Sequence, residues 1–373
     1  MSWHTLRLGD VITLQRGHDL PEAQRQDGDV PVVSSSGITG SHNEPKAKAP
    51  GVVTGRYGTL GEVFFIEDDY WPLNTALYVT DFKGNHPRFV AYFLQNVLRN
   101  YQSDKAAVPG VNRNVLHELK VQSTDTKSQE KVANILSTYD DLIENNRRRM
   151  ALLEEAARQL YREWFIRLRF PGHEHTRITN GVPEGWERKR LAEVAAINRE
   201  SLPNSFDAEI EYIDISSVTP GNINETTRYD FRDAPSRARR VVQHGDIIWS
   251  CVRPNRRSYA VIWQPGSSQI VSTCFAVLTP MSIPTAFLLQ ATTTDAFVGY
   301  LENHARGAAY PAVVAGDFER FEILIPRSSL VAAFNEQAEP LLSQAHTLRL
   351  QNGRLRAARD LLLPRLMNGE IAV

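Results

Sequence analysis

The stretch from residue 128 to residue 165 contains neither glycine nor proline, and it constrains the fold more than any other feature. Its apolar residues recur at alternating steps of three and four, the a/d pattern of a helix that packs lengthwise on another helix. A helix of this length would be roughly 57 Å long and could not bury its seam alone. Thr126 or Ser128 is expected to cap it. The predicted seam is Leu136, Tyr139, Ile143, Asn146, Met150, Leu153, Ala157, Leu160 and Trp164.

A second seam with the same rhythm lies 202 residues further along the chain. Each copy holds one polar Asn, a residue that can fix the register of paired helices at some cost in stability. Pro340 and Pro364 are expected to kink the second helix or end its regular part. The predicted partner seam is Ala338, Leu341, Ala345, Leu348, Asn352, Leu355, Arg359, Leu362 and Leu366.

The globular parts of the chain are also duplicated. Residues 8–11 (LGDV) resemble residues 191–194 (LAEV), and residues 73–79 resemble residues 271–277. The period is far longer than that of a solenoid repeat, so a duplicated α+β domain is predicted. Strands are expected at 31–33, 51–54, 61–66, 75–79, 211–215, 246–250, 259–263 and 321–326, and a helix at 89–97. The predicted boundaries are 1–126 for the first domain, 127–168 for its helix, 169–185 for a linker, 186–328 for the second domain and 329–373 for the last helix and tail.

Composition and motifs argue against catalysis on this chain. Lys and Arg number 42 and Asp and Glu 43, and no apolar run suits a signal peptide or a membrane span, so a cytoplasmic protein is expected. There is no phosphate-binding loop, no dinucleotide fingerprint and no zinc motif. Cys251 and Cys274 are interpreted as buried thiols, and a metal site at His173 and His175 is not favoured. The tripeptide ending at Lys120 and the one ending at Lys189 match a nuclease motif only by chance. No cofactor or metal is therefore expected.

Two arginine clusters, residues 237–240 and 253–257, form the best candidate for a nucleic-acid surface. The forked donors of Arg and the amide of Asn match the edges of guanine and adenine, and Arg also pairs with phosphate. Loop 253–257 takes the place that the loop of Arg56 and Tyr57 takes in the first domain. A solvated face of an arginine-rich protein is the alternative. The candidate DNA-contacting residues are Lys46, Lys48, Arg56, Tyr57, Lys105, Asn112, Arg113, Asn114, Arg237, Arg239, Arg240, Arg253, Asn255, Arg256, Arg257 and Tyr310.

Two variable domains, each followed by a long helix of the type QEKVAxIL…LLE…RxL, resemble the specificity subunit of type I restriction–modification enzymes. The closing segment RDLLLPRLMNGEI, residues 359–371, and the openings at 8–11 and 191–194 carry the same resemblance. It implies two target-recognition domains that each read half of a split site in double-stranded DNA. It also implies that the helices pack as an antiparallel coiled coil, set the spacer and dock the methyltransferase subunits, with restriction/translocase subunits completing the complex.

The resemblance further implies a non-catalytic subunit with no membrane association. By this resemblance we expect two methyltransferase subunits as partners. We also expect S-adenosylmethionine, ATP and Mg to bind to the partner subunits. Two other interpretations stay open at this point. One is a specificity module of a different methyltransferase or phage-defence assembly, and the other is an adaptor that binds protein and no DNA. Salt-dependent DNA binding would separate the adaptor from both DNA-binding interpretations.

Overall fold

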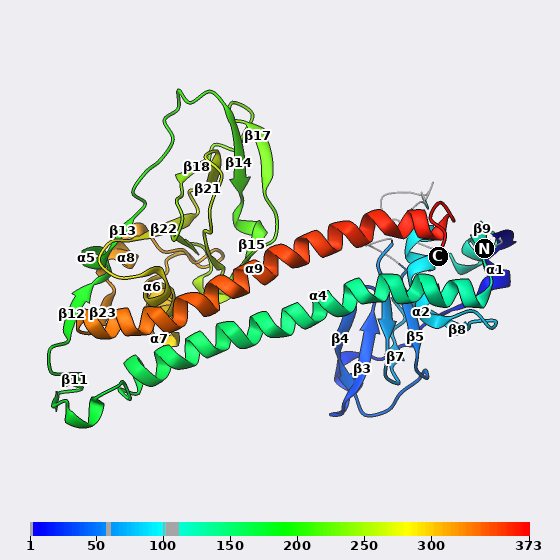
Figure 1. Ribbon diagram of the computed structural model, residues 1–373, viewed down its shortest axis with the longest axis horizontal. Coiled ribbons are helices and arrows are strands. Elements are labelled where there is room, and N and C mark those ends of the chain that lie inside the picture. The colour runs from blue at the N-terminus through cyan, green and yellow to red at the C-terminus, as the bar shows by residue number, and fades with distance from the viewer. Residues whose placement is uncertain (1–2, 57–60, 100, 102–111) are drawn as a thin grey trace. The chain divides into compact units, whose positions relative to one another are not determined.

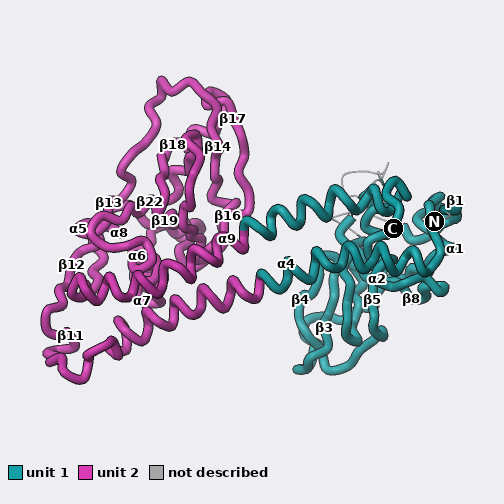
Figure 2. The backbone as a smooth tube through the Cα atoms, in the orientation of Figure 1, with its two compact units in different colours: residues 1–146, 350–373 teal, residues 147–349 magenta. Residues whose placement is uncertain are grey.

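The computed structural model describes residues 3–56, 61–99, 101 and 112–373. The chain divides into two compact units (Figure 2): unit 1 comprises residues 1–146 and 350–373, and unit 2 comprises residues 147–349. Each unit contains one globular domain and one portion of each long helix. The long helices are α4 (Thr126–Tyr161) and α9 (Ser328–Met367), shown in Figure 1.

Helix α4 is capped by Asp125, so the prediction of a cap by Thr126 or Ser128 was wrong. The Asp125 carboxylate accepts hydrogen bonds from the Ser128 backbone N–H at 3.0 Å and from the Ser128 hydroxyl at 2.9 Å. These bonds lower the pKa of Asp125 and supply an acceptor for a helix N–H that has no partner within the helix. After Tyr161 the helix continues as a π-helical turn, Arg162–Ile166.

Helix α9 runs through both of its prolines, so of the two expected effects, a kink or an end of the regular part, neither Pro340 nor Pro364 produces the second. Each proline removes one backbone hydrogen bond from the helix. Burial of the neighbouring side chains compensates for that loss. Ala338 and Leu342 are buried beside Pro340, and Leu363 is buried beside Pro364.

The two long helices pack antiparallel. In unit 1 the Asn146 amide donates to Oδ1 of Asn352 at 3.0 Å, while Asp140, earlier in α4, pairs with Arg359, later in α9. In unit 2 Glu154 pairs with Arg349 at 2.8 Å. Rising numbers in α4 thus meet falling numbers in α9, which is the antiparallel arrangement that the family resemblance implied. None of the eighteen predicted seam residues is in the exposed class.

The buried amide pair gives a prediction about stability. Asn146 and Asn352 are 7% and 3% exposed, and Nδ2 of Asn352 also donates to the carbonyl of Ile143 at 3.1 Å. Changing Asn146 alone to Leu leaves the Asn352 carbonyl without that donor, so the free energy of unfolding should fall by about 1–3 kcal/mol. The double variant Asn146→Leu/Asn352→Leu should recover that loss, because it buries no unpaired amide. Urea unfolding of the three proteins measures the difference, and equal stability of the single and double variants would contradict it.

Unit 1 contains an antiparallel four-stranded sheet in the order β2–β8–β5–β6 and a three-stranded sheet in the order β4–β3–β7, in which β3 and β7 are parallel. Strands β1 and β9 form a separate antiparallel pair. Helix α2 begins with a proline, which suits the first helical position, and buries one face on the sheet. The bounds are β1 His4–Arg7, α1 Leu8–Val11, β2 Thr13–Arg16, β3 Val30–Ser34, β4 Gly37–His42, β5 Gly51–Gly55, β6 Val63–Ile66, β7 Trp71–Pro72, β8 Ala76–Asp81, α2 Pro87–Arg99, α3 Arg113–His117 and β9 Lys120–Ser123.

Unit 2 contains an antiparallel four-stranded sheet in the order β13–β22–β19–β20 and a second sheet in the order β17–β14–β21–β18, in which β14 and β21 are parallel. The predicted linker is not featureless, because residues 178–183 form a short hairpin. The bounds are β10 Ile178–Thr179, β11 Val182–Pro183, β12 Glu187–Arg190, α5 Leu191–Val194, β13 Ala195–Ile197, β14 Glu209–Ile213, β15 Val218–Thr219, β16 Asn222–Ile223, β17 Thr227–Asp230, β18 Ala238–Val241, β19 Ile247–Ser250, β20 Tyr259–Val261, β21 Gln269–Ser272, β22 Phe275–Pro280, α6 Thr285–Ala291, α7 Asp295–His304, α8 Ala315–Arg320 and β23 Glu322–Ile325.

The two domains share one topology. Strands β2, β8, β5 and β6 of unit 1 occur in the same chain order and sheet order as β13, β22, β19 and β20 of unit 2. The outer pair β1–β9 matches β12–β23, and the parallel pair β3–β7 matches β14–β21. The α+β fold with an internal repeat, predicted from the sequence, is therefore confirmed. The β5–β6 loop and the β19–β20 loop occupy equivalent positions in the two domains.

Each domain is fixed to its portion of the helix pair by a continuous apolar core. In unit 2, Phe165 packs edge-on against Phe287 at 5.0 Å and Phe334 at 5.2 Å between ring centroids. In unit 1, Leu136 of α4 and Leu366 of α9 belong to the same buried cluster as Phe89 of α2. Large aromatic side chains contribute much of the free energy of such packing. These cores hold the loops of each domain in a fixed position on the helices of the same unit.

Candidate nucleic-acid interface

The loop between β19 and β20 is a rigid turn in unit 2. Arg253 and Arg257 both have a φ of +51°, and residues Pro254–Arg256 between them form a 3-10 turn. A positive φ is unusual for a residue with a side chain and is kept only where surrounding contacts hold it. One such contact is the hydrogen bond from the Arg253 N–H to the carbonyl of Pro311, at 2.7 Å. The loop is therefore held in place by the segment at 306–312.

The Arg253 side chain stacks on Tyr310. Its guanidinium carbon lies 4.7 Å from the centre of the Tyr310 ring, and Nη2 donates to the carbonyl of Ala309 at 3.2 Å. Tyr310 itself is 70% exposed. An exposed aromatic ring is a surface on which a base or sugar can pack, and the stacked Arg adds positive charge beside it. The structure thus brings together two candidates, Arg253 and Tyr310, that lie 57 residues apart in the sequence.

The other residues of the loop differ in their surroundings. Asn255 and Arg256 are exposed, and Arg257 forms an ion pair with Asp295 at the start of α7. The hydrogen bond and the charge of Arg257 lower the pKa of Asp295. Part of the Arg257 charge is therefore compensated within the protein, whereas Arg256 presents its charge to solvent.

Arg237 lies beside this loop. It directly precedes β18, and its carbonyl accepts a hydrogen bond from the Thr273 N–H at 2.8 Å. The next residue in that turn, Cys274, accepts from the Cys251 N–H at 2.8 Å, at the start of the arginine loop. The turn at residues 273–274 therefore contacts both the segment that contains Arg237 and the start of the β19–β20 loop.

Arg237 is bound by two residues that the sequence analysis missed. Its guanidinium pairs with Asp214 at 3.0 Å, and its Nε donates to the hydroxyl of Tyr212 at 3.3 Å. Tyr212 and Asp214 are two positions apart at the end of β14, so their side chains leave the same face of the strand. The spacing of two along a strand is the sequence pattern that could have identified Tyr212 and Asp214 as a pair.

Two further members of the first arginine cluster are partly buried against neighbouring residues. Arg239 lies over the ring of Phe231 at 4.4 Å and donates to the carbonyl of Ala238. Arg240 reaches the hydroxyl of Ser201 at 3.5 Å. The structure therefore separates Arg239 and Arg240 from the solvent-facing Arg237.

In unit 1 the equivalent loops also gather at one turn. The Arg56 N–H donates to the carbonyl of Thr75 at 3.0 Å, and the Ser35 N–H donates to the Thr75 hydroxyl at 3.4 Å. Arg16, at the end of β2, donates to the carbonyl of Asn74 at 3.4 Å. The end of β2, the β3–β4 turn and Arg56, which follows β5, thus meet at residues 74–75. Arg16 and Asn74 were not among the predicted site residues.

The remaining candidates of unit 1 have mixed surroundings. Lys46 lies 5.7 Å from the centre of the Trp71 ring, and Lys48 pairs with Asp69 at 2.6 Å. Asn112 caps α3 by accepting from the Asn114 N–H at 2.9 Å. Asn112, Arg113 and Asn114 are exposed. Tyr57 and Lys105 lie outside the described residues.

The groups considered as chance matches to catalytic motifs take part in surface ion pairs. Glu118 pairs with Arg7 at 2.8 Å, and Glu187 pairs with Lys189 at 3.0 Å. Cys251 is partly buried, and desolvation raises the pKa of its thiol to about 12. Within residues 3–56, 61–99, 101 and 112–373, no group of three or more His, Cys, Asp or Glu side chains could hold a metal ion. The same residues include no helix long and apolar enough to cross a membrane.

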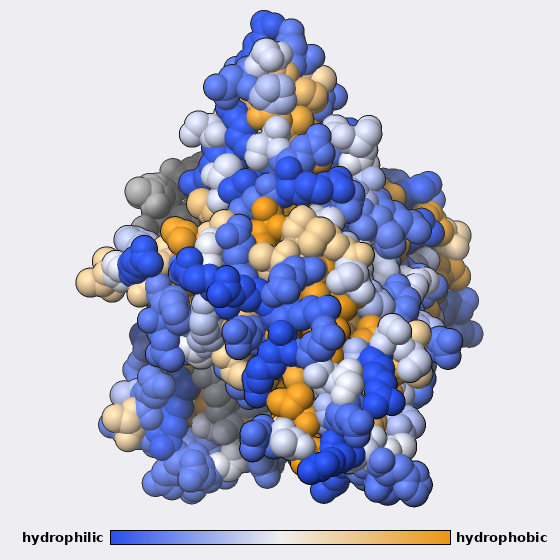
Figure 3. Space-filling model, turned by 90° about the vertical axis from the view of Figure 1, so that its left-hand side faces the viewer, coloured by the Kyte–Doolittle hydropathy of each residue, from blue (hydrophilic) through white to orange (hydrophobic). Residues whose placement is uncertain are grey.

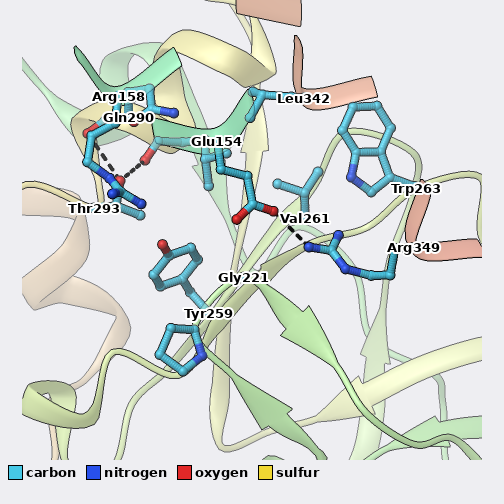
Figure 4. Close-up of a pocket in the computed structure, with 12 residues that line it drawn as sticks. Glu154, Arg158, Gly221, Tyr259, Val261, Trp263, Gln290, Thr293, Leu342 and Arg349 are labelled. Carbon is cyan, nitrogen blue, oxygen red and sulfur yellow. Dashed lines mark hydrogen bonds and ion pairs between the residues drawn. The ribbon is translucent and has the colours of Figure 1, made fainter. Parts of the chain in front are cut away.

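A cavity of about 130 Å³ lies in unit 2 between α4, α9 and the globular domain. Figure 4 shows the carboxylate of Glu154 and the guanidinium of Arg349 pointing toward each other across it, with Tyr259 and Trp263 on other sides. The ion pair joins the two helices, and the aromatic residues belong to the domain. We interpret this cavity as part of the joint between helices and domain.

The surface view in Figure 3 is dominated by hydrophilic residues, with apolar residues in small separate patches. A broad apolar docking surface is therefore not a feature of that face.

The known proteins described next, to which this chain is similar, are all specificity subunits or domains of type I restriction–modification systems. Residues 1–155 match the model of the type I restriction modification DNA specificity domain. The chain is 23% identical to the type I restriction enzyme MjaIX specificity subunit of Methanocaldococcus jannaschii, over 73% of this chain and 65% of that protein. It is 20% identical to the HindI specificity subunit of Haemophilus influenzae, over 83% of this chain and 84% of that protein. The chain thus covers less than two thirds of the archaeal relative.

A solved structure shares the fold. The type I restriction–modification S subunit from M. genitalium superimposes with a TM-score of 0.62 over 98% of this chain and 96% of that chain, at 14% identity. The family model covers the first domain and most of α4, the sequence relatives align over most of the chain, and the fold match covers nearly all of it. Residues 1–155 therefore match the DNA specificity domain family of type I restriction–modification systems, and the whole chain is similar in fold to a solved S subunit.

Proposed function

We propose that this chain is the DNA-specificity subunit of a type I restriction–modification complex and that each domain recognises one half of a bipartite site in double-stranded DNA. The observation that carries the proposal is the shared topology with unlike loops. At equivalent positions, the β5–β6 loop of unit 1 contains Arg56, whereas the β19–β20 loop of unit 2 contains the arginine cluster 253–257. Two copies of one scaffold with different loop side chains suit two half-sites of different sequence.

We further propose that the chain carries no catalytic activity of its own. Its partners would be two methyltransferase subunits docked on α4 and α9, together with restriction/translocase subunits, in the cytoplasm. S-adenosylmethionine, ATP and Mg would bind to those partners. The long helices support this role, because each extends over more than thirty residues outside the recognition loops.

The test of this function is assembly with the cognate methyltransferase subunits, followed by sequencing that detects methylated adenine in DNA. The assembled complex should methylate one asymmetric bipartite motif, whereas the methyltransferase subunits alone should show no such motif. Binding of DNA by the complex should weaken steeply with salt, because phosphate contacts release counterions. Binding of protein partners with no salt-dependent DNA binding would favour the adaptor.

The chain alone gives a separate prediction. Incubated with DNA and S-adenosylmethionine, the purified protein should transfer no methyl group, and incubation with ATP and Mg should produce no cleavage. The expected result follows from the lack of a recognisable cofactor motif in the sequence. Methyl transfer that persists after a second purification, and that disappears with a variant of this chain, would contradict it.

A further inference from the structure

Asp214 is a fixed acceptor at the surface of unit 2. Its Oδ1 accepts from the Ser216 N–H at 3.1 Å and from the Ser216 hydroxyl at 2.8 Å. Its Oδ2 accepts from the Tyr212 hydroxyl at 2.9 Å. Burial alone would raise the pKa of Asp214, but these hydrogen bonds and the charge of Arg237 hold it below its usual value. The carboxylate is therefore ionised and oriented at neutral pH.

Asp214 engages one edge of the Arg237 guanidinium. Nε and Nη2 of Arg237 lie 3.2 Å and 3.0 Å from Oδ2, and Nε also donates to the Tyr212 hydroxyl at 3.3 Å. This uses one N–H of Nε and one of Nη2. The two N–H groups of Nη1 and the second N–H of Nη2 remain at the far end of the guanidinium. The contacts of Arg237 with Asp214 and Tyr212 all use Nε and Nη2, not Nη1.

We propose that Arg237 recognises a guanine in the half-site of the second domain, with Asp214 and Tyr212 as the residues that position it. The proposal rests on the function proposed above and names one of its base contacts. The free end of the guanidinium carries two parallel N–H groups, which match O6 and N7 of guanine in the major groove. The Arg237 side chain is 50% exposed, whereas Asp214 is 23% exposed. The Arg237 guanidinium is thus accessible to DNA, whereas the Asp214 carboxylate that positions it is partly shielded from solvent.

The fixed geometry favours a base over a phosphate. Pairing with a base edge is directional, so an arginine already held in one orientation loses little conformational freedom on binding. A phosphate accepts from many directions and gains less from such a support. The position also fits, because the Arg237 segment and the arginine loop contact the same turn at residues 273–274.

Arg228 supplies a matched control in the same sheet. Its Nε and Nη2 lie 3.1 Å and 2.8 Å from Oε1 of Glu211, so the ion pair has the same form. Arg228 lies on β17, at the sheet edge opposite to β18. An arginine that acts only through surface charge would behave like Arg228.

The experiment uses the full chain assembled with its methyltransferase subunits. Rates are measured on the cognate site and on sites with each base of the motif changed in turn. The wild-type complex should lose about 5- to 150-fold in rate when the guanine is changed. Arg237→Ala should lose a similar factor on the cognate site and then treat all four bases at that position alike, while discrimination at every other position stays.

Three further variants separate positioning from general structure. Asp214→Asn keeps the size of the side chain and should relax the same base position by a smaller factor. Arg237→Lys keeps the charge but lacks the fork, so it should resemble Arg237→Ala in specificity while showing near wild-type affinity for random DNA. Arg228→Ala should leave every position unchanged. Equal thermal melting of the assembled complexes shows that the variants are folded.

Two outcomes overturn the assignment. An equal loss on all sequences with a smaller salt slope would make Arg237 a phosphate contact. Unchanged discrimination in folded Arg237→Ala and Arg237→Lys complexes would remove Arg237 from the interface. A wild-type complex that methylates no bipartite motif would instead contradict the proposed function itself, and this assignment with it.

Discussion

The triple variant Arg253→Ala/Arg256→Ala/Arg257→Ala is expected to lose recognition by the second domain. Each base-reading arginine contributes about 1–3 kcal/mol of discrimination, so losing even two such contacts should slow methylation of the cognate site by a factor of about 30 or more. The physical reason is the rigid turn, which presents Arg253 on the exposed Tyr310 ring and Arg256 to solvent. The measurement is the methylation rate of the assembled complex on cognate DNA.

Single variants show how much each of the three arginines contributes to the methylation rate. Arg257→Ala should matter least, because Arg257 is paired with Asp295. Arg253→Ala should also weaken the contact of Tyr310, since the ring loses the guanidinium that stacks on it. Arg232→Ala is the matched control, because Arg232 is 72% exposed and paired with Asp207 outside the loop. If the triple variant methylates the same motif at the wild-type rate, the assignment of this loop to the interface is wrong.

The sequence predicted the helices and the repeat well, because both depend on local periodicity and on comparison of the chain with itself. The a/d spacing located α4 and α9, and the strand signals at 51–54 and 75–79 fall within or beside β5 and β8. The helix cap and the effect of the prolines were harder to predict from the sequence. Asp, Thr and Ser all suit the N-cap position, so the sequence alone did not select Asp125 over Thr126 or Ser128. Burial around Pro340 could not be known before the partner helix was placed.

The candidate interface was only partly accessible from sequence. A run such as Arg237–Arg240 looks like one positive patch in the sequence. In the structure Arg239 covers the ring of Phe231 and Arg240 reaches Ser201, so only Arg237 is exposed, and these tertiary contacts cannot be predicted from the run itself. The support of Arg237 by Asp214 joins residues 23 positions apart through the strand order of a sheet, which no local pattern encodes.

The largest expected effect concerns the length of the helix pair, which we propose to act as a ruler between the half-sites. Helix α4 is uninterrupted from Thr126 to Tyr161, and α9 is uninterrupted from Ser328 to Met367. Asn146 and Asn352 lie opposite each other and define the register of the pair. Matched insertions of four residues after both positions would lengthen each helix by about 6 Å, close to one turn, and would rotate the seam by only about 40°.

The four-residue variant should therefore fold and recognise unchanged half-sequences, with the gap between them enlarged by a base pair or two, since about 6 Å is roughly two base pairs. A matched insertion of two residues rotates the seam by roughly 200° and turns its apolar residues outward. That variant should fail to assemble an active complex. Sequencing of methylated motifs in cells that carry each variant measures both results. An active four-residue variant with an unchanged gap would show that the spacing is set by something other than the helices.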